Sequence, residues 1–222
     1  MASVGPPGWS EGTPGASARR EAERRRANRE RRVRERHPLL GGVILALQKA
    51  PQHERNWGAG GKSEERMAES LARKCGERVT WLYDRRIQRS RANIDMLAFA
   101  PSGVWVIDAK DYKGEVRIVR PRSGRPKLVI DGWNRSKLID TLDWQVGLVR
   151  EAVGALDPTV PVHGALCFGV RAELPLLRTL EVRGYLMGYP RPLARRLRAK
   201  GPLSTAYLER VRQRLAVEFP EA

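Results

Sequence analysis

Residues 93–110 read NIDMLAFAPSGVWVIDAK, and this stretch decides the fold. Two apolar segments, residues 94–100 and 104–109, flank the tripeptide Pro-Ser-Gly at 101–103. Apolar runs of this length around a Pro/Ser/Gly turn are typical of a β-hairpin. We therefore expect two antiparallel strands here, and the polar residues within them become the first candidates for a functional site.

The register of this hairpin determines which polar side chains meet. A turn with two central residues would place Asp95 directly opposite Asp108, on one face of the sheet, with Cβ atoms about 5 Å apart. Lys110 lies two residues after Asp108 and points to the same face, and Asn93 lies opposite it. A turn one residue longer would separate the two faces.

Two carboxylates opposed across an apolar hairpin repel each other and are costly to desolvate. A hard divalent cation with oxygen ligands would offset both effects. Magnesium or manganese held by Asp95 and Asp108 could bind a phosphodiester oxygen and lower the pKa of an attacking water, while Lys110 stabilises charge on phosphorus. The alternative is structural: Asp108 and Lys110 form an exposed ion pair of little energetic value, and Asp95 caps a turn.

The remaining pattern predicts an α/β domain. Apolar residues at helical spacing predict helices over 63–75, 138–156 and 193–217, the first with Ser63 as its N-cap and the last broken at Gly201-Pro202. Strand composition marks residues 79–83, 115–119, 128–130, 162–170 and 182–187. We expect a mixed central sheet flanked by helices, with a basic N-terminal extension.

The N-terminal extension has its own composition. Residues 1–18 are rich in Gly, Pro, Ser and Ala and are expected to be disordered. Residues 19–36 contain ten Arg and four Glu, spaced so that a solvated helix is plausible. This segment either keeps the protein soluble or attracts nucleic acid. We place a basic extension at 1–55 and the folded domain at 56–222.

Composition limits the class of protein. The chain of 222 residues carries 42 Lys+Arg against 25 Asp+Glu, a net charge of +17, which favours polyanionic partners. Two cysteines, Cys75 and Cys167, exclude a disulfide framework and favour a reducing compartment. The longest apolar run, residues 38–47, is about half a membrane span, and no secretory signal is visible. The sequence thus predicts a cytoplasmic protein without a membrane partner.

The motifs together resemble a known family. The hairpin at 93–110, the Tyr-Lys-Gly that follows at 112–114, the Glu-Glu-Arg at 64–66 and residues 161–168 look like the nuclease-related domain (NERD) family, which is placed with the PD-(D/E)xK, restriction-endonuclease-like nucleases. The resemblance implies that Asp95 and Asp108 bind Mg²⁺ or Mn²⁺, that Lys110 is the motif lysine, and that Glu64 supports the metal.

Two helical residues join this candidate site. Glu64 lies three residues before Met67 and is therefore expected on the inward helix face, whereas Glu65 is the fallback and is expected in solvent. Gln145 also lies on an inward face, where a buried amide needs partners. The acidic site could supply them, or Gln145 could be purely structural.

Three further positions bear on activity. Ser63 stands where members of the family usually have Gly, and Met96 stands where many have His, which leaves full activity open. His163 is predicted to be structural rather than catalytic.

Three functions follow as hypotheses. The first is metal-dependent hydrolysis of nucleic-acid phosphodiester bonds, with DNA favoured over RNA. The second is a catalytically inactive nucleic-acid-binding module of the same fold, which binds through the Arg-rich segments 19–36 and 191–198 and is sensitive to salt. The third is a protein-interaction scaffold whose charge serves only solubility.

Overall fold

The computed structural model describes residues 10–36, 38 and 52–222, with no description of the side chains of 52–61. The predicted apolar run at 38–47 therefore lies outside the described residues, apart from residue 38. Within the described part of the chain, no helix has both the length and the apolar character that a membrane span requires.

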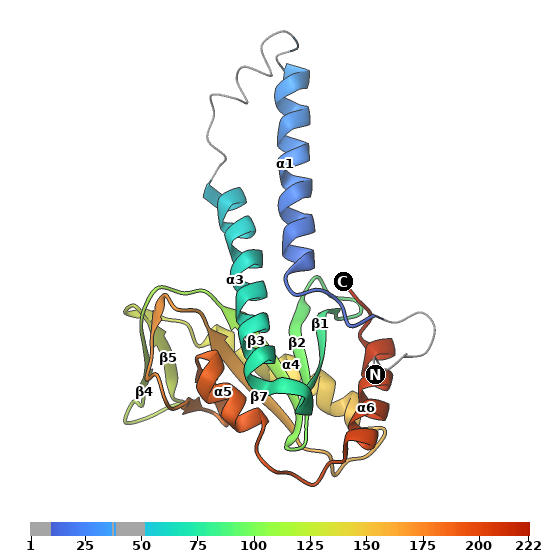
Figure 1. The fold of residues 1–222 in the computed structure, drawn as a ribbon. Coiled ribbons are helices and arrows are strands. Elements are labelled where there is room, and N and C mark those ends of the chain that lie inside the picture. Colours follow the sequence, from blue (N-terminus) through green and yellow to red (C-terminus); the bar gives the residue numbers. More distant parts are fainter. Residues whose placement is uncertain (1–9, 37, 39–51) are drawn as a thin grey trace.

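A mixed six-stranded sheet forms the centre of the molecule (Figure 1). Its strands, in the order β1-β2-β3-β7-β10-β9, are β1 (Thr80–Arg86), β2 (Asn93–Ala100), β3 (Gly103–Lys110), β7 (Val162–Phe168), β10 (Tyr185–Gly188) and β9 (Leu180–Val182). The pairs β1–β2, β2–β3 and β9–β10 are antiparallel, whereas β3–β7 and β7–β10 are parallel. The predicted mixed sheet is confirmed.

The β2–β3 hairpin has a two-residue turn, which is one of the two turn lengths that the sequence left open. Ala100 pairs with Gly103, and the pairing continues to Met96 opposite Ile107. Asp95 and Asp108 are the next opposed positions in this register. The backbone pairing between β2 and β3 ends before these two residues, and the Asp95 side chain instead accepts a hydrogen bond from a backbone N–H of β3.

Helices cover both faces of this sheet, as alternation along the strands requires (Figure 1). On one face, α3 (Gln52–Cys75) and α5 (Pro190–Leu197) pack their apolar residues against Met96, Ala98 and Ile107. On the other face, α4 (Lys137–Gly154) and α6 (Thr205–Glu218) pack against Leu97, Phe99 and Val106.

A second, smaller sheet extends from the end of β3. Its order is β6-β5-β4-β8, with strands β4 (Gly114–Val119), β5 (Lys127–Ile130), β6 (Trp133–Asn134) and β8 (Ala172–Glu173). A short 3₁₀ helix, η1 (Gly76–Arg78), links α3 to β1. The second sheet lies at the Lys110 end of β3, because β4 begins four residues after that strand.

Residues 10–18 are ordered by contacts with the domain, which corrects the predicted disorder for this part of the leader. The Tyr83 N–H donates to the Glu11 carbonyl at 2.7 Å. Buried Arg85 donates to the Ser10 carbonyl at 2.9 Å, and buried Arg212 pairs with Glu11 at 2.7 Å. The leader then enters α1 (Ala16–Arg36), which stands beside α3 and extends away from the sheet (Figure 1).

Two boundaries differ from the sequence prediction. Helix α3 begins at Gln52, so Ser63 lies inside the helix and is not its N-cap. The predicted strand at 182–187 is two strands, because Arg183 and Gly184 adopt positive φ angles of 53° and 82° and form a tight turn.

Candidate active site

Asp95, Asp108 and Lys110 lie together at the open end of the β2–β3 hairpin. Asp95 Oδ2 accepts a hydrogen bond from the Ala109 backbone N–H at 2.8 Å. The Lys110 ammonium donates to Asp108 Oδ1 at 2.5 Å, and Asp108 is only 6% exposed. The pair is therefore a partly buried one, and not the exposed ion pair of the structural alternative.

The charges at this end of the hairpin are unbalanced. Burial raises the pKa of Asp95 well above its ordinary value, and Asp108 and Glu64 raise it further. Burial opposes the charge on Lys110, yet Asp108 and Asp95 outweigh burial and raise its pKa. One ammonium thus faces several carboxyl groups, and the site favours additional positive charge.

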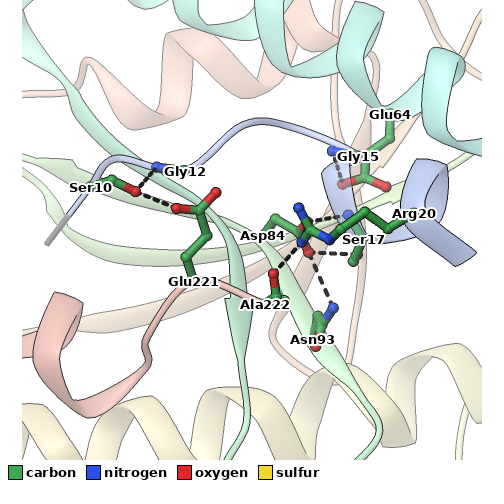
Figure 2. A network of polar contacts seen from close by, with 10 residues as sticks. All are labelled: Ser10, Gly12, Gly15, Ser17, Arg20, Glu64, Asp84, Asn93, Glu221 and Ala222. Carbon is green, nitrogen blue, oxygen red and sulfur yellow. Dashed lines mark hydrogen bonds and ion pairs between the residues drawn. The ribbon is translucent and has the colours of Figure 1, made fainter.

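Glu64 reaches the same site from α3. Its Oε1 accepts a hydrogen bond from the Gly15 backbone N–H of the leader at 2.9 Å (Figure 2). Burial raises the pKa of Glu64 to about 7; the Gly15 N–H lowers it, and nearby Asp84 and Asp108 raise it. Glu64 is therefore partly protonated near neutral pH and sensitive to any added cation.

Asp84 is a fourth carboxylate that the sequence reasoning missed. It is 1% exposed within β1 and accepts hydrogen bonds from the Ser17 N–H and hydroxyl at 2.5 and 2.6 Å and from Asn93 Nδ2 at 3.1 Å. Arg20 pairs with it at 3.6 Å (Figure 2). The predicted strand stopped at Tyr83, three residues before the end of β1, and so left Asp84 out. An acidic residue directly after the apolar Trp-Leu-Tyr run was the available signal.

Gln145 points from α4 toward the base of the site. It is 4% exposed, and its Nε2 donates to the Asn93 carbonyl at 3.0 Å. Within the described residues its Oε1 has no hydrogen-bond partner. Because a buried acceptor without a partner is costly, this oxygen favours a donor from outside the chain, such as a water molecule.

The residues fit a small hard cation with a partial protein shell. Within the described ranges, no three His, Cys, Asp or Glu side chains are grouped closely enough to hold a metal. Mg²⁺ ordinarily binds through one or two carboxylates and retains several waters, so Asp95 and Asp108 suffice for it. The raised pKa of Asp95 shows that its ionised form lacks enough positive charge around it, and such an ion would supply that charge.

The remaining candidates lie away from the acidic groups. Met96 is fully buried on the opposite face of β2. Glu65 pairs with Arg19 at 3.0 Å. His163 lies at the turn end of the hairpin, where its Nε2 is 3.1 Å from the Ser102 carbonyl and its ring packs on Trp105.

A family model described as the nuclease-related domain matches residues 59–169. The matched range spans half of the chain and includes every candidate residue above, from Glu64 to Gln145, with Asp84 among them. No curated protein and no solved structure matches the chain.

Proposed function

The chain belongs to the nuclease-related domain family, and from that premise we propose that its acidic site hydrolyses nucleic-acid phosphodiester bonds, with DNA favoured over RNA. The observation that carries the proposal is the opposition of Asp95 and Asp108 beside Lys110 at the buried end of the hairpin. Structural ion pairs balance their charges, whereas this group retains an excess of carboxylates.

We propose Mg²⁺ or Mn²⁺ as the cofactor, held by Asp95 and Asp108. When bound, such an ion polarises a phosphoryl oxygen and lowers the pKa of a coordinated water. Glu64 acts on the ion directly or through a water, which is consistent with a carboxyl group whose pKa of about 7 leaves it able to ionise when positive charge arrives.

Lys110 stabilises developing charge, and Gln145 orients a water molecule. Lys110 remains charged because of Asp108, and a fixed ammonium can stabilise the negative charge that develops on phosphorus. The Oε1 of Gln145, which has no partner among the described residues, can accept a hydrogen bond from a water and so orient it. Fixed charges and dipoles in a largely buried site act more strongly than they would in bulk water.

A second candidate is a catalytically inactive module that binds nucleic acid. Two contacts favour it: Lys110 is paired with Asp108 at 2.5 Å, and Glu64 is engaged by the leader. This candidate predicts binding that is sensitive to salt and independent of metal. The exposed arginines of α5, within the predicted segment 191–198, would contribute to it.

The test is a cleavage assay on DNA with Mg²⁺ or Mn²⁺, comparing the parent chain with Asp108→Ala and Lys110→Ala. We expect each substitution to lower the rate by about 10²–10³-fold or more. The matched control is Glu115→Ala, which also removes an ion-paired carboxylate, from the exposed Arg117–Glu115 pair, and should leave the rate unchanged. Cleavage that survives both site substitutions would remove these residues from the mechanism.

A further inference from the structure

A cavity of about 870 Å³ lies between the N-terminal helix and the acidic site. Its acidic side contains Glu64 and Asp95, together with Asn93. Its other walls come from α1 and from the segment that joins β1 to β2. A cavity of this size accommodates a small part of a polymer, such as a short stretch of one strand, and not a whole duplex.

The N-terminal arm, which we define as residues 10–36, is fixed at the edge of this cavity by polar contacts. Gly15 donates to Glu64, and Ser17 donates through both its N–H and its hydroxyl to Asp84 (Figure 2). Ser17 lies in the first turn of α1, so Asp84 meets the positive end of that helix. Arg20 adds a contact to Asp84 and one to the carbonyl of Ala222. The arm is therefore a wall of the site.

Five arginines line the cavity around the acidic groups. Three come from α1 and two from the end of β1 and the loop after it: Arg20, Arg24, Arg25, Arg86 and Arg91. The planar guanidinium binds phosphate through two hydrogen bonds, which makes arginine suited to a nucleic-acid backbone. The arrangement places phosphate-binding groups beside Asp95 and Glu64, two of the carboxyl groups of the acidic site.

The ion pairs that Arg24 and Arg25 make with Glu21 are easily replaced. Arg24 and Arg25 both pair with Glu21 at 2.5 Å, and the Arg24 side chain is 71% exposed. Ion pairs at such exposed positions contribute little to stability, so a phosphate can take the place of Glu21 at small cost.

We propose that the arm and the β1–β2 end together form a channel for one nucleic-acid strand, so that the substrate is single-stranded or a frayed end. This inference rests on the proposed function, because it assigns the substrate class to the same site. A duplex would have to displace the arm from Glu64 and Asp84, whereas one strand fits beside it. Because no aromatic residue is among the described residues that line the cavity, binding depends on phosphates and has little base preference.

The test measures binding by fluorescence anisotropy with the full chain in EDTA, so that it requires no cleavage. The probes are a labelled single-stranded DNA oligonucleotide and the duplex of the same sequence. We expect the single strand to bind more tightly by on the order of tenfold. Arg24→Gln/Arg25→Gln should weaken single-strand binding and reduce the slope of log K against log salt by about 1.4, since each lost phosphate contact removes about 0.7.

The matched control is Arg31→Gln/Arg34→Gln. It removes two arginines from the same helix that also pair with glutamates, each four residues away, but these arginines do not line the cavity. The control should leave the affinity and the salt slope close to those of the parent. Equal effects of the two double variants, or a duplex that binds as tightly as the single strand, would overturn the inference. If the protein cuts duplex DNA and does not prefer single strands, the proposed function stands and only the single-strand inference is overturned.

Discussion

The two ends of the β2–β3 hairpin differ in how their polar groups are satisfied. At the turn end, Ser102 Oγ donates to the Leu197 carbonyl at 3.0 Å and accepts from Trp105 Nε1 at 3.1 Å, and His163 meets the Ser102 carbonyl. At the open end, Asp95 and its neighbouring carboxyl groups share one ammonium. Among the described residues, the polar side chains at the turn end have their partners within the chain, whereas the carboxyl groups at the open end have too few positive partners.

This difference between the two ends predicts which substitutions affect stability and which affect activity. A polar group whose partners all come from the chain contributes to folding, and its loss leaves a buried group unsatisfied. A cluster of buried like charges works against folding, and its presence is explained by something that it binds. Substitutions at the turn end should therefore lower the free energy of unfolding, and substitutions at the open end should lower activity.

The largest effect is expected from Asp95→Asn. We expect cleavage to fall by about 10³-fold, as for other groups that stabilise the transition state electrostatically. Asparagine can still accept from the Ala109 N–H, and it removes a carboxyl group whose pKa burial and Asp108 raise, so thermal stability should not fall. Cleavage rates and melting curves of parent and variant check both parts. A variant that cleaves at the parent rate but melts at a lower temperature would contradict both expectations.

The next largest effect is expected from Gly103→Ala at the turn end. Gly103 has a φ of +139°, and an added Cβ would lie 2.5 Å from the Pro161 carbonyl oxygen, which is backbone and cannot rotate away. We expect a loss of about 2–3 kcal/mol in the free energy of unfolding. Denaturant titration measures this loss. The cleavage rate per folded molecule should stay at the parent value, and a fall in that rate would tie the turn to catalysis.

A pH-dependent effect is expected from Glu64→Gln. Since the pKa of Glu64 is raised to about 7 in the folded protein, folding favours its protonated form. Its contribution to the free energy of unfolding is therefore greatest at low pH and is lost as the pH rises toward 7 and above. Glutamine keeps the acceptor for Gly15, so the variant should melt several degrees higher than the parent at pH 8 and nearly equally at pH 5. An equal difference at both pH values would show that Glu64 does not titrate in this range.

The smallest effect is expected from Ser102→Ala. The substitution removes the bond to Leu197 and leaves Trp105 Nε1 without its acceptor, which should cost about 1 kcal/mol in the free energy of unfolding. Urea unfolding with a fixed m-value would detect the change. No change in cleavage is expected, because the turn lies at the opposite end of the strands from Asp95.

The sequence predicts local structure well where periodicity decides it. The apolar runs around Pro101-Ser102 predict both strands, and of the two turn lengths that the sequence left open the structure has the shorter, which pairs Ala100 with Gly103. The inward position of Gln145 follows in the same way from its spacing to buried residues of α4. Both depend only on neighbours along one element.

Contacts between distant segments could not be predicted in this way. The leader has the composition of a disordered segment, yet Gly15 and Ser17 are ordered by Glu64 and Asp84, which are 49 and 67 residues away. Ser63 is a residue type that often caps helices, but α3 begins at Gln52, so Ser63 lies inside the helix. Asp84 is held by hydrogen bonds from Ser17 and Asn93, and no periodic pattern in the sequence relates these three residues.

The most direct test of the central claim is an anomalous diffraction measurement on crystals soaked in Mn²⁺. We expect a peak between Asp95 and Asp108, about 2.1 Å from an oxygen of each, and its loss in the Asp95→Asn variant. Crystals that show no peak there, with Lys110 still bound to Asp108, would contradict a metal site at the open end of the hairpin.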